Sequence, residues 1–423
     1  MKLSMNQTII ELLTKINDCG YEAYLVGGAV RDAILNQPNN DYDICTNMPL
    51  HLIKELYPNF HLMKPNNNRN TGVIRLDGLE IEISEFKGNT IAEDLHNRDF
   101  TINAMALDKN GNLIDPYNGI ESLQQKTISL IDKKGTALQE DPLRILRGIR
   151  IAAKMNFEID QNCKTQMEYK KRLLVEVAVE RIYRELIQIL ISDNPSHYIR
   201  DNISIFFEVL PELKSMHQFN QNNPWHIYDV LEHTLVALEH TEKNIFLRFA
   251  VLFHDIGKPS KYTIDKEGTG HFYGHPEKSE EMFLAIANRL KMDNKTKKLV
   301  SRLIKDHDSK LSKKSDKIYE FLKVNGFDYT LLLFKLKRAD NLAQNPEKAS
   351  PVLEELDTTE QLYKEHMLRF DNLELNGSKL VELGYSGKRI KLILDDVKKL
   401  VVTNRLPNDE RIIMEYISRR HRI

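Results

Sequence analysis

Hydrophobic periodicity changes once along this chain, near Glu140, and that change limits the folds open to it. Before Glu140, short apolar runs alternate with turn signals. The segment VIRLDGLEIEISEF alternates apolar and polar residues on both sides of Asp77-Gly78, which predicts a two-residue β-hairpin. After Glu140, apolar residues recur at helical spacing. The sequence therefore predicts an α+β fold, with a mixed-sheet head followed by an all-helical remainder.

A chain of 423 residues is too long for one ordinary domain. Pro211, Pro224 and the segment QFNQNNP indicate a boundary near residues 211–224, and we expect a loop at Asn345–Pro351. Four domains are expected: a head over residues 1–138, a helical neck and body over 139–212, a separate helical domain over 213–345 and a helical tail over 346–423.

Composition excludes a global attraction to polyanions. The formal net charge is −1, so a nucleic-acid site must be a local basic patch, and Lys133–Arg184 is one. Three scattered cysteines suit a reducing compartment rather than a disulfide framework. The start, MKLSMNQTIIELL, predicts an amphipathic helix rather than a signal segment, and no apolar run is long enough to span a bilayer. We expect a soluble, cytoplasmic protein without a membrane partner.

The stretch YLVGGAVRDAILNQPNNDYDICT combines a glycine pair with two carboxylates. Strands are expected at Tyr24–Val26 and Asp43–Cys45, with a helix over Ala29–Leu35. Gly27 and Gly28 would let backbone N–H groups approach a triphosphate at the start of that helix, and Arg31 adds positive charge. These three residues are candidates for binding an anion. The alternative is a tight turn followed by a solvated loop.

Asp41 and Asp43 flank Tyr42, so their side chains share one face of an extended strand. Two neighbouring carboxylates repel each other and are kept ionised by a shared divalent cation, and hard oxygen ligands favour Mg²⁺. Either motif alone is usually a turn, but their order and spacing together favour a nucleotide site.

LVGGAVRD followed by DYD resembles the class II tRNA nucleotidyltransferases, the family of CCA-adding enzymes and bacterial poly(A) polymerases. Four later segments resemble further family motifs in order: RDFTINAMAL (Arg98–Leu107), DPYNGIESL (Asp115–Leu123), EDPLRILRGIR (Glu140–Arg150) and VAVERIYREL (Val177–Leu186). Three positions depart from the family pattern. Asn97 precedes Arg98 where an arginine is usual, Lys87 stands where an arginine is frequent, and Thr71-Gly72 reverses the usual order.

The resemblance implies a polymerase beta-like head that binds Mg²⁺ and nucleotides. It assigns catalysis to Asp41, Asp43 and a third acid, Glu82. It assigns nucleotide binding to Gly27, Gly28, Arg31, Arg98, Asp99, Asn103, Asp141, Arg144, Arg147 and Arg150. Asp141 and Arg144 lie three residues apart and are expected on one helical face, where they would read the base and select CTP or ATP. For an isolated pair, a surface ion pair is the simpler interpretation.

A second cluster follows in the helical half. WHIYDVLEHTL is expected to place His226, Asp229 and His233 on one helical face. The series His254-Asp255, His275, His307 and Asp340 continues it, and imidazole with carboxylate suits a transition metal or Mg²⁺. Taken singly, each histidine is more simply a structural or surface residue.

The ordered series resembles the HD phosphohydrolase superfamily. The resemblance implies that His233, His254, Asp255 and Asp340 are the core metal ligands, that His275 and His307 extend the site, and that His226 lies outside it. Lys258 would neutralise a phosphate. The ion is expected to be divalent, and Mg, Mn, Ni, Co and Fe stay open.

The expected function is template-independent addition of CMP and AMP to the tRNA 3′ end from CTP and ATP, with pyrophosphate release. We also expect a phosphohydrolase activity in the HD domain. CC-adding, A-adding and poly(A)-adding relatives share these motifs and stay open, as does a protein that is mainly an HD phosphodiesterase or phosphatase. In the tail, SGKRIK is expected to open a helix, either to meet RNA phosphates or as a solvated surface. The oligomeric state stays open.

Overall fold

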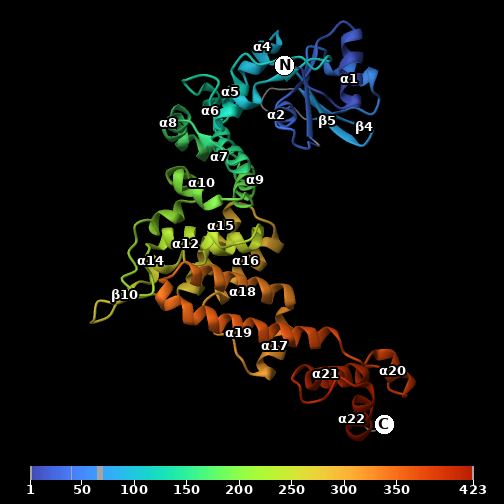
Figure 1. The fold of residues 1–423 in the computed structure, drawn as a ribbon, viewed down its shortest axis with the longest axis vertical. Coiled ribbons are helices and arrows are strands. Elements are labelled where there is room, and N and C mark those ends of the chain that lie inside the picture. Colours follow the sequence, from blue (N-terminus) through green and yellow to red (C-terminus); the bar gives the residue numbers. More distant parts are fainter. Residues whose placement is uncertain (1, 40, 64–69, 422–423) are drawn as a thin grey trace. The chain divides into compact units, whose positions relative to one another are not determined.

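A computed structural model describes residues 2–39, 41–63 and 70–421 of the chain. Its contacts divide the chain into two compact units, Met1–Val209 and Leu210–Ile423 (Figure 1). The first contains the mixed sheet and the second is almost wholly helical, as the change of periodicity predicts. None of the helices in the described residues is long and apolar enough to cross a bilayer.

The head is built on a seven-stranded sheet with the order β3-β4-β5-β2-β1-β6-β7. Its strands are β1 (Ala23–Val26), β2 (Asp41–Thr46), β3 (His61–Leu62), β4 (Thr71–Leu76), β5 (Leu79–Glu85), β6 (Ala106–Leu107) and β7 (Leu113–Ile114). Only the β2–β5 pair among these is parallel. The β4–β5 hairpin turns at Asp77 (φ 48°) and Gly78 (φ 81°), which confirms the predicted two-residue turn.

Short helices accompany this sheet. They are α1 (Gln7–Asp18), α2 (Gly28–Ile34), α3 (Leu50–Leu56), α4 (Ile91–His96), the 3₁₀ turn η1 (Thr101–Asn103) and α5 (Gly119–Gln125). The amphipathic first helix is confirmed: Asn6 caps α1, whose apolar face buries Ile9, Leu12 and Ile16. The predicted helix after the glycine pair is also confirmed, and α2 begins at Gly28.

The rest of the first unit is helical except for the short pair β8 (Thr127–Ile128) and β9 (Glu158–Ile159). Its helices are α6 (Thr136–Glu140), α7 (Arg144–Met155), α8 (Gln161–Lys170), η2 (Lys171–Glu176), α9 (Val179–Leu190), α10 (Pro195–Asp201) and α11 (Ile203–Val209). Gly148 lets α7 approach the head closely, because a β-carbon there would lie 2.7 Å from Cζ of Phe100. That approach brings the arginines of α7 to the residues around Asp99.

The second unit begins with η3 (Pro211–Ser215). Its other elements are α12 (Val230–Glu239), α13 (Ile245–Phe253), α14 (Lys258–Lys261), β10 (Thr263–Ile264), β11 (Gly270–His271), α15 (His275–Arg289), α16 (Asn294–Asp306), α17 (Ser315–Asn325), α18 (Phe327–Leu342), α19 (Pro346–Asp371), α20 (Gly377–Glu382), α21 (Lys388–Val402) and α22 (Glu410–Arg420). The last three helices, α20–α22, share a core of their own around Leu380, Ile393 and Ile413. The helix that SGKRIK was expected to open is confirmed as α21, which begins at Lys388.

The predicted loop at Asn345–Pro351 is wrong, because α19 already begins at Pro346. Asn345 caps the helix through its Oδ1, which accepts the N–H of Glu347, and proline suits the first helical position. Pro351 lies one turn further in, where it forfeits one main-chain hydrogen bond. Burial of Leu356 and Tyr363 in the core against α18 compensates for that loss.

Candidate functional site

Gly27 ends β1 and begins the turn into α2 with φ 70° and ψ −136°, a conformation that favours glycine. A β-carbon at this position would lie 3.2 Å from both Oδ2 of Asp43 and NH1 of Arg98. The glycine therefore lets a carboxylate and a guanidinium from distant segments close around the start of α2.

Asp41 and Asp43 lie on β2 and point to the same face of the sheet, as strand alternation requires. In the parallel β2–β5 pair, Glu82 stands opposite Asp43 and Glu80 opposite Asp41, and Glu80 pairs with Arg75 at 2.6 Å. Glu82 is therefore the acid next to Asp43, although its side chain is exposed. Among the described residues, the three acids do not form a group whose ligand atoms all lie within 4.8 Å.

A buried polar chain links the second motif to α2 and α7. NH1 of Arg31 donates to Oδ1 of Asn103 at 2.8 Å, and the Asn103 amide donates to Asp99 at 3.0 Å. The other oxygen of Asp99 pairs with Nε of Arg147 at 2.9 Å. Burial favours the neutral acid, but the Arg147 charge and the Asn103 hydrogen bond outweigh it and lower the pKa of Asp99. Asp99 and Asn103 thus hold two arginines in place.

Two adjoining pockets of about 120 and 170 Å³ lie next to these hydrogen-bonded side chains. Both are lined by Gly28, Asp43, Asn103 and Arg147. The smaller pocket is also lined by Gly27, Arg98, Asp99 and Arg144. The larger pocket is also lined by Arg31, Asp41 and Arg150. Five guanidinium groups next to a carboxylate pair form a cradle for a polyphosphate and its cation. Glu82 and Asp141 line neither pocket.

The placement of Asp141 and Arg144 on one helical face is wrong. Asp141 precedes α7 in an extended conformation (φ −138°), because Pro142 disfavours a helical residue before it. Its carboxylate pairs with Arg181 at 2.8 Å. Arg144 donates to the carbonyl oxygens of Ala137 and Asn97 at 3.2 and 3.1 Å.

Two residues of the head site, Asp94 and Glu185, carry no expectation from the sequence. Asp94, in the first turn of α4, pairs with Arg98 at 3.0 Å and accepts the N–H of Lys87 at 3.0 Å. The i, i+4 spacing of Asp94 and Arg98 was a usable signal for this pair. Arg150 is likewise held by Glu185 at 2.6 Å, but 35 residues separate those two and nothing local links them.

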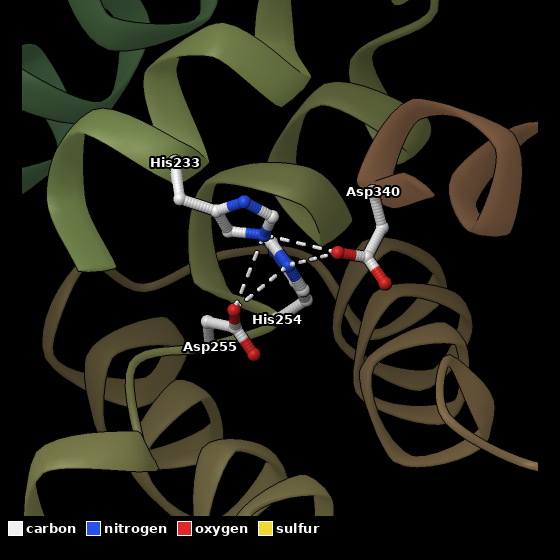
Figure 2. A group of neighbouring side chains, drawn as sticks. All are labelled: His233, His254, Asp255 and Asp340. Atoms are coloured by element: carbon white, nitrogen blue, oxygen red, sulfur yellow. Dashed lines mark hydrogen bonds and ion pairs between the residues drawn. The ribbon is translucent and has the colours of Figure 1, made fainter. Parts of the chain in front are cut away.

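In the second unit, four side chains from three segments converge (Figure 2). Nε2 of His233 on α12 lies 3.0 Å from Oδ1 of Asp340 on α18 and 3.4 Å from Oδ2 of Asp255. Nε2 of His254 lies 3.2 Å from the same Asp255 oxygen and 3.6 Å from Asp340. All four residues offer ligand atoms within 4.8 Å of one another, which fits one metal ion.

A second group shares Asp255 with the first. Its other oxygen, Oδ1, lies 3.3 Å from Nε2 of His275 and 3.7 Å from Nε2 of His307, and these two nitrogens are 3.1 Å apart. The three residues again form a set of ligand atoms within 4.8 Å. Asp255 therefore stands between two ligand sets, where one carboxylate could bridge two ions.

All four imidazoles are oriented by the backbone. Nδ1 of His233, His254, His275 and His307 contacts the carbonyl oxygens of Ala343, Val251, Phe272 and Ile304 at 3.2, 2.7, 2.9 and 2.6 Å respectively. A carbonyl only accepts, so each Nδ1 carries a hydrogen, and each Nε2 is the atom that points into the cluster, where it offers a metal ion a lone pair when the ring is neutral. Among the described residues, Nε2 of His254 and both oxygens of Asp255 are buried without a hydrogen bond of good geometry. These donors fit divalent metal ions.

Electrostatics at this site follow from its burial. Burial lowers the pKa of His307 to about 3, with His254 as the next cause, so this imidazole is neutral. Burial also acts on His254, but the carboxylates of Asp255 and Asp340 outweigh it and raise its pKa to about 10. Lys258 pairs with Oδ2 of Asp255 at 2.7 Å. Acidic and basic groups are thus concentrated in one buried place, as in many functional sites.

The expected single helical face of His226, Asp229 and His233 is wrong. α12 begins only at Val230, and Asp229 caps it by accepting the N–H of Glu232 at 2.7 Å. His226 lies in the preceding loop, where its ring is perpendicular to that of His233 at 5.1 Å. Burial lowers the pKa of His226 to about 3. It belongs to neither ligand set.

Models of three protein families match this chain. The family described as "Poly A polymerase head domain" matches residues 23–129, "Probable RNA and SrmB- binding site of polymerase A" matches 156–216, and "HD domain" matches 226–345. The three matches follow one another along the chain without overlap.

Relatives and solved structures agree with these matches. The CCA-adding enzyme of Streptococcus pyogenes serotype M5 is 27% identical over 97% of this chain and 96% of its own length. The CC-adding tRNA nucleotidyltransferase of Halalkalibacterium halodurans is 37% identical over 44% of this chain and 49% of its own.

Among solved structures, the Bacillus stearothermophilus CCA-adding enzyme in complex with CTP has a TM-score of 0.63 at 21% identity, with coverage of 98% of this chain and 97% of that one. The Thermotoga maritima enzyme complexed with tRNA has a TM-score of 0.62 at 21% identity, with coverage of 98% and 96%. These likenesses establish the fold. Together with the ordered motifs and the family matches, they lead to one conclusion: the chain belongs to the tRNA nucleotidyltransferase and poly(A) polymerase family and carries an HD domain.

Proposed function

We propose that this enzyme adds CMP and AMP to the 3′ end of tRNA, using CTP and ATP without a nucleic-acid template. The observation that carries the proposal is the pair of adjoining pockets beside the start of α2, whose linings together include Asp41, Asp43 and five arginines. The Streptococcus relative named as a CCA-adding enzyme aligns over nearly the whole chain, which supports the same activity.

In this proposal, each side chain has a role set by its position. Arg98, Arg147 and Arg31 bind triphosphate oxygens, with Asp99 and Asn103 as positioning residues. Asp41 and Asp43, with Glu82 adjacent, hold Mg²⁺, which when bound supplies Lewis acidity toward the phosphate oxygens. The tRNA 3′-hydroxyl gives its proton to solvent water, and its oxygen bonds to the α-phosphorus. The bond between the α-phosphorus and the bridging oxygen breaks, and that oxygen leaves with the pyrophosphate.

Nucleotide choice falls to Asp141 and Arg144 in this proposal. Both now contact protein partners, Arg181 for Asp141 and two carbonyl oxygens for Arg144. Reading a base therefore requires an exchange of these contacts for contacts with the base edge. Arg181→Met removes one competing partner and should alter the ratio of CMP to AMP incorporation.

Primer extension tests this function directly. Three labelled tRNAs, ending before the first C, before the second C and before the A, are incubated with Mg²⁺ and CTP, ATP, both, or UTP and GTP. We expect C, C and A to be added in order and addition then to stop. Asp41→Ala should abolish incorporation and retain tRNA binding; near-normal turnover would refute the carboxylate assignment.

CC addition is the second candidate. The Halalkalibacterium relative named as a CC-adding enzyme has the higher identity, although the alignment covers only about half of each chain. The same assay separates the two, because a CC-adding enzyme extends the first two tRNAs with C and leaves the third unextended.

We propose a second activity for the HD domain, hydrolysis of a phosphoester. The support is the convergence of four inward-facing Nε2 atoms on Asp255 and Asp340, with Lys258 as an anion partner. Divalent ions bound there would acidify water and polarise the phosphoryl group. A water oxygen bonds to phosphorus, one ester P–O bond breaks, and the released oxygen takes a proton.

Metal-dependent hydrolysis of a cyclic phosphate tests the second activity. Purified protein is freed of metal with a chelator and then supplied separately with Mg²⁺, Mn²⁺, Ni²⁺, Co²⁺ and Fe²⁺. We expect at least one ion to restore hydrolysis in the wild type and none to do so in His254→Ala. Absence of hydrolysis with every ion would refute this activity.

We also propose the four-part division of the chain at residues 138, 212 and 345. The positions of the family matches and the separate core of α20–α22 support it, whereas α19 shares a core with α17 and α18. A cytoplasmic location is proposed as well, supported by reduced thiols at Cys19, Cys45 and Cys163.

A further inference from the structure

Asp94 is a buried carboxylate of the head that the mechanism above does not use. Its side chain is 1% exposed, and it lines the pocket of about 120 Å³ together with Gly27, Asp43 and Arg98. A buried ionised group is costly unless its charge is compensated and its oxygens are hydrogen-bonded. The partners of Asp94 therefore show what this carboxylate holds in place.

The two oxygens of Asp94 contact different segments of the head. Oδ1 accepts the backbone N–H of Lys87, just after β5, at 3.0 Å. Oδ2 accepts hydrogen bonds from Nε and NH2 of Arg98 at 3.2 and 3.0 Å. Lys87 and Arg98 both line the smaller pocket. One carboxylate thus ties the loop after β5 to the guanidinium on the pocket wall.

The third nitrogen of Arg98, NH1, reaches the turn before α2. A β-carbon on Gly27 would lie 3.2 Å from this nitrogen and 3.2 Å from Oδ2 of Asp43. The Arg98 side chain is only 13% exposed, so it has little space to adopt another direction. A guanidinium is planar and its donors are fixed relative to one another. Because Asp94 engages Nε and NH2, it also sets the direction of NH1.

We propose that Asp94 is a positioning residue for nucleotide addition, which directs NH1 of Arg98 at the triphosphate oxygens beside Gly27 and Asp43. This inference rests on the proposed nucleotide addition and adds the residue that orients one of its guanidinium groups. Asp94 also compensates the positive charge of Arg98, so it weakens the attraction of this group for an anion. Loss of the carboxylate should therefore impair the orientation of Arg98 and strengthen its attraction for the triphosphate.

Asp94→Asn separates orientation from attraction. The amide keeps the size of the side chain, but its NH2 group cannot accept a hydrogen bond from either Lys87 or Arg98. We expect kcat for CMP incorporation to fall by roughly tenfold or more, because Arg98 is no longer aligned with the phosphate oxygens in the transition state. KM for CTP should stay the same or fall, since the triphosphate meets one negative charge fewer.

Equilibrium binding gives a readout that does not depend on turnover. Calorimetric titration with CTP and Mg²⁺ should show binding to Asp94→Asn that equals or exceeds binding to the wild type, and weaker binding to Arg98→Met. General damage to the pocket would instead weaken binding in both variants. The proposal is overturned if Asp94→Asn binds CTP as weakly as Arg98→Met does, or if it retains the wild-type kcat.

A double-mutant cycle shows whether Asp94 acts through Arg98. Single-turnover incorporation of CMP is measured in the wild type, in both single variants and in the double variant. In the Arg98→Met background, Asp94→Asn should lower the rate no further, because no guanidinium is left to direct. A second loss as large as that in the wild-type background would show that Asp94 acts without Arg98, and the proposal would be wrong.

Two further variants complete the set. Asp94→Glu keeps the charge and both oxygens but displaces them by one methylene, so it should lower kcat and retain the wild-type KM even if the asparagine variant does not fold. Glu415→Gln is the matched control, because Glu415 also pairs with an arginine four residues later, Arg419, but both side chains are exposed and lie in the second unit. It should change neither kcat nor KM.

The outcomes separate this inference from the proposed function. If the wild type adds nucleotides and Asp94→Asn has the kinetic constants of the wild type, the role of Asp94 is wrong and nucleotide addition stands. If the wild type adds no nucleotide, the proposed function fails, and the comparison of CTP binding between Asp94→Asn and Arg98→Met alone decides whether Asp94 tempers the charge of Arg98.

Discussion

Gly27 is subject to two independent constraints. Its φ of 70° disfavours any side chain, and an added β-carbon would lie 3.2 Å from Asp43 and Arg98. Gly20 shares the first constraint, with φ 86°, but among the described residues no atom lies within 4 Å of its would-be β-carbon. The two glycines therefore separate backbone strain from disturbance of the pocket.

We expect Gly27→Ala and Gly20→Ala each to lose stability, on the order of 1 kcal/mol or more, because a positive φ disfavours a side chain at both positions. Only Gly27→Ala should lower kcat/KM for CMP incorporation, by roughly tenfold or more, since displaced Asp43 and Arg98 no longer fit the reacting geometry. Thermal unfolding and primer extension measure the two effects. An equal loss of activity in both variants would show that strain, and not contact, governs the site.

Asp99 gives the site a pH dependence that can be worked out. Its pKa in the folded protein lies below the ordinary 3.8, since Arg147 and Asn103 outweigh burial. The ionised form therefore stabilises the fold above pH 3.8, and this contribution is lost as the pH falls through the lowered pKa.

We expect the difference in unfolding free energy between wild type and Asp99→Asn to be largest at neutral pH. It should shrink as the pH falls below 3.8, the reference value for the unfolded chain, because the wild type then loses the charge that the variant lacks. Calorimetric unfolding of both proteins from pH 7 down to pH 3 measures this. A difference that stays constant over the whole range would mean that the Asp99–Arg147 ion pair contributes nothing.

At the scale of elements, the cap of α12 couples helix stability to the HD site. Asp229 accepts the N–H of Glu232 at 2.7 Å, and His233 lies in the next turn. Asp293 caps α16 in the same way, accepting the N–H of Thr296 at 2.9 Å, but the first turn of α16 carries no ligand.

Removal of either cap should cost about 1 kcal/mol of stability. Asp229→Ala should in addition weaken metal binding, since a frayed first turn no longer orients His233, whereas Asp293→Ala should bind metal as the wild type does. Calorimetric titration with Mn²⁺ or Ni²⁺ and thermal unfolding test the pair. The coupling is refuted if both variants keep full metal affinity.

Element type was predictable wherever local signals agreed. The hairpin at Asp77-Gly78 and the helix after Gly27-Gly28 follow from turn chemistry alone, and both are confirmed. The loop expected at Pro351 failed because burial of later residues keeps α19 helical through a proline. The helical faces assigned to Asp141 and His226 failed because spacing in sequence does not show where a helix begins.

The same distinction between local and tertiary signals applies to the residues of the two candidate sites. Residues with ordered family motifs were found in the sequence, and most of the nucleotide candidates line two adjoining pockets. Residues that act through tertiary contact, such as Glu185 on Arg150, carry no local signal. Only the folded chain brings them to the site.

At the scale of the whole molecule, the two candidate sites lie in different compact units. The carboxylates and arginines of the head belong to residues 1–209, and all six HD ligands belong to residues 210–423. Each candidate site has its own acidic residues, so we expect neither chemistry to depend on groups of the other.

We therefore expect two separable activities. Asp41→Ala should reduce nucleotide addition by more than roughly a hundredfold and leave cyclic-phosphate hydrolysis within about twofold of wild type, and His254→Ala should do the reverse. Both reactions are measured on the same preparations of full-length protein, with Mg²⁺ for addition and the activating metal for hydrolysis. Thermal unfolding of each variant excludes a general loss of folding.

Metal removal extends the test. Six ligands, five of them buried, share one cluster, so a bound ion stabilises the unit that holds it. A chelator should lower only the unfolding transition assigned to the HD unit, and His254→Ala should show that lower transition without the chelator. If chelation lowered the transition of the head equally, or if His254→Ala stopped nucleotide addition, the two sites would be coupled, and independent chemistry in two units would be wrong.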